Sequence, residues 1–140
     1  MTKLTPQDWL NKYYPIPVKE CLEADALDNS ILKWSGLYPS ILKRYGIVRK
    51  YDDLFTMIFD ECLLRIDDQT CALCKFYFKT SSCIECPLSI ARGNVSCDVI
   101  TTKETYSPYE TWSWIGDPKP MLRDLRKAKR AQIKQKGRKR

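Results

Sequence analysis

Five of the seven cysteines lie between residues 71 and 97, with a spacing that could hold a metal ion. Two Cys-x-x-Cys pairs, Cys71/Cys74 and Cys83/Cys86, are separated by eight residues, and Cys97 follows them. A Cys-x-x-Cys turn aims two sulfurs at one point, so two facing turns make a tetrahedral site of four thiolates. Because four sulfurs leave no position open for water, we expect a structural Zn²⁺ held by Cys71, Cys74, Cys83 and Cys86, with Cys97 as the alternative ligand.

The same cysteines have other possible uses. They fit buried reduced thiols, a set of disulfides, a redox-active Cys-x-x-Cys pair or an iron–sulfur cluster. Zinc is preferred because nothing else in the sequence suggests electron transfer. Four thiolates around Zn²⁺ leave a negative charge, which Lys75, Lys79 and Arg92 are close enough in sequence to offset. Cys21, far from the cluster, is expected to be a small buried side chain.

Catalysis has little support in the residue types. The chain contains no histidine, which removes the commonest general base and a common metal ligand. No phosphate-binding loop or glycine-rich nucleotide motif is present either. Three carboxylate pairs are predicted to form a solvated acidic face rather than a two-metal site: Asp52/Asp53, Asp60/Glu61 and Asp67/Asp68. We therefore expect a protein that is not an enzyme.

Positive charge is concentrated at the end of the chain. The last 22 residues carry 11 Lys and Arg against Asp124 alone, whereas the first 118 carry 13 against 16 Asp and Glu. Such a segment favours binding to nucleic acid, DNA or RNA, through phosphates. A solubilising or disordered end is the alternative. The expected nucleic-acid-binding residues are Arg123, Arg126, Lys127, Lys129, Arg130, Lys134, Lys136, Arg138, Lys139 and Arg140.

Helices are the main elements expected to position these residues. Thr5 and Pro6 predict the start of a short first helix, and a second is expected from Pro17 to Leu27. The third and fourth are predicted over 30–37 and 39–46, as two packed helices or, alternatively, a helix-turn-helix DNA reader. The amphipathic run 54–66, capped by Asp52 and Asp53, predicts the clearest helix.

The cysteine region is expected to be a small β-hairpin unit. Lys75–Phe78 and the run 95–102 are predicted strands, with a turn at Gly93-Asn94. Ser107 begins a capping-box pattern for an aromatic helix ending at Gly116. The aromatic residues there, Tyr109, Trp112 and Trp114, are expected to pack over the zinc site, and base stacking is the alternative. Asp117-Pro118 starts the basic helix, whose thin apolar stripe is Met121, Leu122, Leu125 and Ala128.

The predicted fold is thus mainly α, with a zinc-knuckle β-hairpin and a basic C-terminal helix. Residues 1–118 are expected to form one helical domain that includes the zinc-binding region 71–97, and residues 119–140 a basic helix or tail. No apolar run is long enough to span a membrane, and the N-terminus has no signal-type segment, so we expect a cytoplasmic protein without a membrane partner.

The order of these motifs resembles a known group. The run CALC…CIECPL…C followed by SPY and Trp112, preceded by WSGL…LKRYGI, is similar to small uncharacterised proteins of tailed bacteriophages and prophages. The resemblance covers roughly residues 28–114 and does not include the basic end. It implies a viral protein in the host cytoplasm and no particular activity.

Three functions are consistent with the sequence. The preferred one is a zinc-stabilised phage protein that binds nucleic acid through its basic helix. The first alternative is an interaction module that binds and inhibits a host enzyme, a polymerase or a defence nuclease. Its basic end would then dock in an acidic groove of that enzyme. The second is a thiol redox protein, which two facing Cys-x-x-Cys pairs disfavour.

Overall fold

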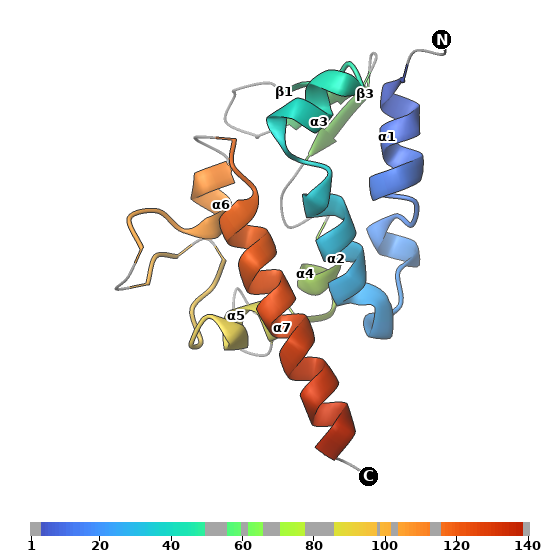
Figure 1. Cartoon of the computed structure of the whole chain (residues 1–140). Coiled ribbons are helices and arrows are strands. Elements are labelled where there is room, and N and C mark those ends of the chain that lie inside the picture. Colours follow the sequence, from blue (N-terminus) through green and yellow to red (C-terminus); the bar gives the residue numbers. More distant parts are fainter. Residues whose placement is uncertain are drawn as a thin grey trace.

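The computed structural model describes residues 4–49, 56–59, 62–65, 71–77, 86–97, 99–101, 104–112 and 116–138, and it is mainly helical (Figure 1). The predicted fold class is confirmed at this level. The longer helices are α1 (Pro6–Tyr13), α2 (Ala26–Ser35), α3 (Pro39–Arg44), α4 (Ala72–Tyr77) and α7 (Lys119–Arg138). The shorter ones are α5 (Pro87–Ala91), α6 (Pro108–Glu110), η1 (Val18–Glu20) and η2 (Glu23–Asp25).

Helix α1 begins as the sequence predicts. The Thr5 hydroxyl accepts from the Asp8 N–H at 3.2 Å, and the Asp8 carboxylate accepts from the Thr5 N–H at 2.8 Å, which satisfies two otherwise unpaired backbone donors. The helix buries Trp9, whose indole N–H donates to the Gly36 carbonyl at 2.8 Å. A Cβ on Gly36 would lie 2.5 Å from the ring of Tyr13, so only glycine lets α1 approach the end of α2 this closely.

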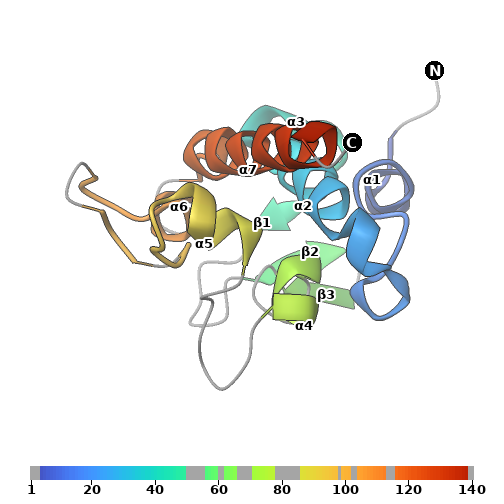
Figure 2. The ribbon, with the colours of Figure 1, turned by 90° about the horizontal axis from the view of Figure 1, so that it is seen from below.

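Helix α2 lies at the centre of the molecule. It packs against α1, α4 and α7, and Figure 2 shows α7 on one side of it and α4 with the β2–β3 pair on the other. Its buried positions recur at helical spacing and are Ala26, Leu27, Ser30, Lys33 and Trp34. The predicted helix from Pro17 to Leu27 is wrong: two short 3₁₀ turns, η1 and η2, precede α2 instead. Cys21 between them is buried, as expected.

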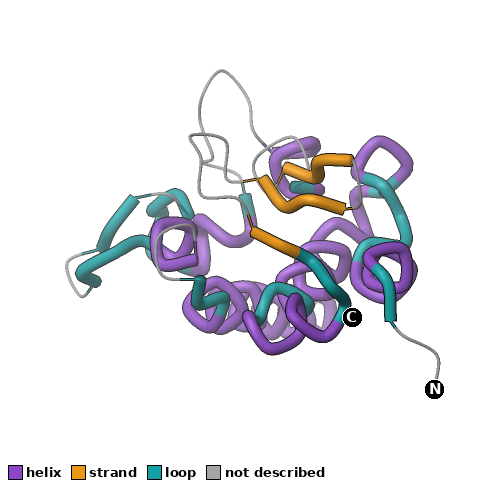
Figure 3. The backbone as a smooth tube through the Cα atoms, turned by 90° about the horizontal axis from the view of Figure 1, so that it is seen from above, coloured by secondary structure: helices purple, strands orange, loops and turns teal. Residues whose placement is uncertain are grey.

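The middle of the chain departs most from the prediction. Instead of a helix over 54–66, the structure has an antiparallel sheet of β1 (Val48–Arg49), β2 (Thr56–Phe59) and β3 (Cys62–Arg65), grouped together in Figure 3. Met57 pairs with Leu64, and Phe59 with Cys62. Each of the two strands contains three consecutive apolar residues, which fit the helical and the strand periodicity alike, and Thr56, Ile58 and Phe59 favour strands. The three carboxylate pairs all lie outside the described residues.

The cysteine region also differs from the expectation. Its regular elements within the described residues of 71–97 are helices, α4 and α5, so the predicted strand at Lys75–Phe78 is wrong over Lys75–Tyr77. Phe78 lies outside the described residues. No strand occurs in the described part of 95–102, but the turn at Gly93-Asn94 is confirmed, with φ of 76° and 68°.

The first half of α7 belongs to the core. Its stripe of four apolar residues, from Met121 to Ala128, is at most 2% exposed and lies in one cluster with Trp9 and Trp34. The Asp117 carboxylate accepts from the Lys119 N–H at 3.0 Å, which caps the helix near the predicted point. The division between residues 1–118 and 119–140 stays a prediction. Helix α7 packs against α2 and α5, so the two parts share one core.

Candidate functional site

Cys71 and Cys74 lie side by side at the start of α4. Cys71 directly precedes the first helical residue, so its sulfur and that of Cys74, one turn along, face the same way. The hydrogen bond from the Cys74 side chain is the largest cause that lowers the pKa of Cys71, from 9.0 to about 6. Burial opposes this change, and the charge of Lys33 and the N–H groups of Leu73 and Cys74 favour it. A thiolate pair one helical turn apart supplies half of a tetrathiolate metal site.

The cation next to this pair is one that the sequence analysis missed. Lys33 on α2 is 1% exposed, and its ammonium lies 5.9 Å from the centre of the Trp34 ring. Its charge stabilises the Cys71 thiolate. The buried positions of α2 include residue 33 by their spacing alone, so helical periodicity could have placed this lysine inside.

Two of the three cations expected to offset the thiolates, Lys75 and Arg92, have other partners. The Lys75 ammonium donates to the carbonyls of Lys19 and Cys21, each at 3.0 Å, and Arg92 pairs with Asp124 of α7. Lys79 lies outside the described residues. Among the described residues, the charge that lowers the pKa of Cys71 is therefore that of Lys33 on α2.

The second half of the predicted metal site is described only in part. Cys86 is buried directly before α5, and Cys97 is half-buried in the loop after it, where its carbonyl accepts from the Tyr109 N–H at 3.1 Å. Cys83 lies outside the described residues. Burial, then Glu23, and last the charge of Cys86 raise the pKa of Tyr77, which places Cys86 near the end of α4.

The structure therefore brings Cys71 and Cys74 together and puts Cys86 near the same helix. Within the ranges that the structure describes, no three Cys, Asp or Glu side chains converge as metal ligands would. The set Cys71, Cys74, Cys83 and Cys86 stays a prediction, as does Cys97 as its alternative. A cluster of this kind can bind a metal through deprotonated sulfurs or, without a metal, exchange with disulfides.

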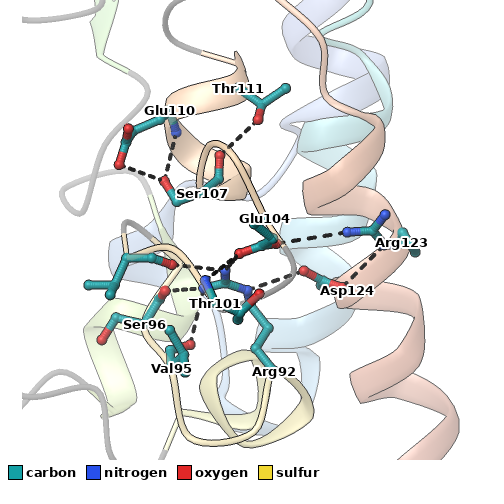
Figure 4. A network of polar contacts seen from close by, with 11 residues as sticks. Arg92, Val95, Ser96, Thr101, Glu104, Ser107, Glu110, Thr111, Arg123 and Asp124 are labelled. Atoms are coloured by element: carbon teal, nitrogen blue, oxygen red, sulfur yellow. Dashed lines mark hydrogen bonds and ion pairs between the residues drawn. The ribbon is translucent and has the colours of Figure 1, made fainter.

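A buried arginine joins the loop after α5 to α7 (Figure 4). The Arg92 side chain is 2% exposed and forms ion pairs with Glu104 at 2.5 Å and with Asp124 of α7 at 3.2 Å. Its guanidinium also donates to three carbonyls of the loop: those of Val95, Ser96 and Val99. Because Arg92 is surrounded by oxygen acceptors, it fixes the loop that carries Cys97 onto the basic helix.

The outer face of α7 carries most of its cations. Arg126, Lys127, Arg130 and Lys134 are exposed, and none of these four forms an ion pair with any residue that the structure describes. Two other predicted residues have partners: Lys129 pairs with Asp28 at 3.0 Å, and Arg123 pairs with Asp124 at 3.4 Å and Glu104 at 4.0 Å. The side chains of Lys136 and Arg138 are not described, and Lys139 and Arg140 lie outside the described residues. Lys119, which the prediction omitted, is also exposed.

Two of the aromatic residues before α7, Trp112 and Tyr109, pack against the core. Trp112 is fully buried, with its ring centre 5.4 Å from that of Trp34 at 82°, and Tyr109 packs against both rings. Trp114 lies outside the described residues. Trp112 and Tyr109 are packed, but the partner described is Trp34 of α2, and packing over the zinc site stays a prediction.

Among the described residues, no helix is both long and apolar enough to cross a membrane. No family model matches this chain, and comparisons with curated proteins and with solved structures find no protein similar to it.

Proposed function

We propose that this protein is not an enzyme and binds nucleic acid through the exposed face of α7. The observation that carries the proposal is the two-sided character of this helix. Met121, Leu122, Leu125 and Ala128 are buried on one side, and the exposed Arg126, Lys127, Arg130 and Lys134 lie on the other. A helix anchored in the core by one face presents the charges of its opposite face in fixed positions, as a phosphate-binding surface requires.

The electrostatics favour a polyanionic partner. The four cations without an ion pair are not neutralised by the acidic residues described around them, although the first 118 residues are slightly acidic overall. A protein that neutralises phosphates releases condensed counterions, and its affinity then falls steeply as salt rises. A merely solubilising end needs no such face and no packing of the same helix into the core.

We further propose that Cys71, Cys74, Cys83 and Cys86 hold a structural Zn²⁺, with Cys97 as the alternative ligand. The paired sulfurs of Cys71 and Cys74 and the buried charge of Lys33 support this assignment. Bound zinc would supply a cross-link and no reaction, because four thiolates close its coordination. Since α5 packs against α7, cross-linking α4 to the segment before α5 would stabilise the base of the basic helix.

We also propose a viral origin and a location in the host cytoplasm. The resemblance of the cysteine and Ser-Pro-Tyr motifs to proteins of tailed bacteriophages supports a viral protein that acts in the host cytoplasm. In that setting, both phage and host nucleic acid are within reach of α7.

Charge-removal variants test the proposal better than truncation, because deleting residues 119–140 would also remove four core residues. The triple variant Arg126→Gln, Arg130→Gln, Lys134→Gln should lose about tenfold or more in affinity for nucleic acid at moderate salt. The matched control Lys12→Gln, Lys19→Gln, Lys43→Gln removes equal charge from α1, η1 and α3 and should bind like the parent. Equal loss in both variants would overturn the role of α7.

Native mass spectrometry tests the zinc proposal. We expect one zinc ion per chain, lost in Cys74→Ser and retained in Cys21→Ser, whose thiol lies outside the proposed ligand set. A parent protein without stoichiometric metal would contradict the zinc proposal and, because the pKa of Cys71 is lowered to about 6, would favour the thiol redox alternative.

A host protein is the alternative partner for the same face. An acidic groove on a host enzyme would meet the same four cations. Pull-down from host lysate with and without nuclease separates the two. One host protein that is retained after nuclease treatment, and lost in the triple variant, would support inhibition of a host enzyme instead of nucleic-acid binding.

A further inference from the structure

The exposed cations of α7 form a straight stripe. Lys119, Arg123, Arg126, Arg130 and Lys134 follow one another at intervals of four, three, four and four residues, which keeps them on one side of the helix. Lys127 lies beside this stripe. At 1.5 Å per residue, the stripe is about 22 Å long, so it can meet several phosphates of one backbone at once.

The far half of α7 projects from the body. Beyond Ala128, the last residue of the buried stripe, Arg130, Ile133 and Lys134 are all exposed. Figure 1 shows this end of the helix extending past the other elements. A rigid helix that stands clear of its own domain can enter a groove without a collision between the domain and the groove walls.

The helix offers charge without an aromatic surface for stacking. No Phe, Tyr or Trp occurs between residues 119 and 138, so α7 has no aromatic ring that could stack on an unpaired base. The nearest aromatic pair described, Tyr109 and Trp112, packs on Trp34 in the core. Sequence-tolerant binding of single strands depends on aromatic side chains that stack on successive bases, which this surface does not provide.

We infer that the partner of α7 is double-stranded DNA, bound through its phosphates without strong sequence preference. This inference depends on the proposed function and narrows its substrate class. The major groove of B-form DNA, about 12 Å wide, admits an α-helix, whereas the major groove of A-form RNA is too deep and narrow for one. A stripe of Arg and Lys along a projecting helix fits phosphates at the edge of such a groove.

Fluorescence anisotropy with labelled oligonucleotides of equal length and mixed sequence tests the inference. We compare duplex DNA, single-stranded DNA and duplex RNA between about 50 and 200 mM salt. Duplex DNA should bind about tenfold or more tightly than either of the others, and log K against log salt should have a slope of about −4 to −5 for five phosphate contacts. Arg126→Gln, Arg130→Gln should flatten this slope by about 2, because two contacts are lost. The control Lys12→Gln, Lys19→Gln should leave it unchanged.

The possible failures are distinguishable. If single-stranded DNA or duplex RNA binds as tightly as duplex DNA, with a slope that still depends on Arg126 and Arg130, the inference is wrong and the proposed function stands. If no oligonucleotide binds, or the double variant binds all of them like the parent, the proposed function fails as well. Binding of duplex DNA that depends on one particular sequence would overturn the phosphate-only character of the contact.

Discussion

Arg92 and Arg130 differ in what surrounds their charge. The Arg92 side chain is 2% exposed and lies among two carboxylates and three carbonyls, whereas Arg130 is exposed and has no ion-pair partner in the described part of the chain. Burial makes each acceptor around Arg92 necessary, because a buried charge without partners is costly. Exposure leaves Arg130 hydrated and able to bind a phosphate, which releases the counterions condensed on the nucleic acid. The same residue type thus stabilises the fold in one region and is available for binding in the other.

Asp124 and Arg123 mark the boundary between the two regions. Both belong to α7, yet Asp124 faces inward to Arg92 at 3.2 Å, and Arg123 extends outward with 65% of its side chain exposed. Helix α7 therefore carries both Asp124, which belongs to the buried cluster, and Arg123, which belongs to the exposed stripe. Substitutions on the inner face should change stability, and those on the outer face should change binding.

The largest expected effect is the loss of Arg92. Arg92→Met would leave Glu104 and Asp124 with no buried cation between them and would remove the donors to three loop carbonyls. Breaking a buried pair by removing one partner costs about 3–5 kcal/mol, so the free energy of unfolding measured in urea should fall by that amount. Arg92→Lys keeps the charge but not the forked donors and should lose less.

Arg130→Met is the matched exposed substitution. An exposed arginine without a partner contributes little to stability, so this variant should unfold within about 0.5 kcal/mol of the parent while its affinity for DNA falls. The comparison between the two regions is wrong if Arg92→Met and Arg130→Met lose similar stability.

Lys33 provides a third environment, a buried cation whose neighbour is a thiolate. The hydrogen bond from Cys74 and the charge of Lys33 both lower the pKa of Cys71, to about 6, against the effect of burial. In metal-free protein, this lowered pKa stabilises the fold fully above the ordinary value of 9.0, and the contribution is lost as pH falls through about 6. The free energy of unfolding should therefore rise with pH between these values, and this rise should be smaller in Lys33→Met.

Alkylation of the thiols measures the same effect directly. At pH 7, iodoacetamide should modify Cys71 of the metal-free protein quickly, and Lys33→Met should slow this reaction by a factor of about 2 to 10. Cys21 is the internal control, because burial and then the charge of Asp25 raise its pKa. Equal rates at Cys71 and Cys21 would show that the Cys71 thiolate is not stabilised, and an unchanged Cys71 rate in Lys33→Met would show that Lys33 does not contribute to its stabilisation.

These environments explain which features the sequence could predict. The cap at Thr5 and the inward stripe of α7 depend on residues three or four positions apart, so local patterns contained them. The cluster of Arg92 joins residues 12 and 32 positions away, and no local pattern encodes that distance. The basic character of α7 was predictable from the sequence, but which cations have partners was not, because Asp28 reaches Lys129 from α2.

The strand and helix errors have one physical cause. The run from Thr56 to Arg65 is apolar at both periodicities, and pairing between strands decided in favour of a sheet. Lys75–Tyr77 has the aromatic composition of a strand, but Ala72 and Leu73 are buried in the core, and α4 packs against α2. Contacts distant in the sequence therefore decided both segments: strand pairing where the local pattern fits either structure, and packing against α2 where the local composition favours a strand.

The smallest expected effect concerns the ion pair between Lys129 and Asp28, which is more exposed than the pairs of Arg92 but, unlike Arg130, has both partners. The two side chains are 31% and 59% exposed and 3.0 Å apart, and exposed pairs of this kind contribute about 0–1 kcal/mol. Asp28→Asn should therefore leave the free energy of unfolding nearly unchanged. It should also release Lys129 for a phosphate, which would raise DNA affinity and steepen the salt slope by about 1. Asp25→Asn, which removes a carboxylate from the adjacent η2 segment without a salt bridge to α7, is the control. If Asp28→Asn and Asp25→Asn raise affinity equally, the gain reflects net charge alone, and the pairing of individual α7 cations does not determine which of them bind DNA.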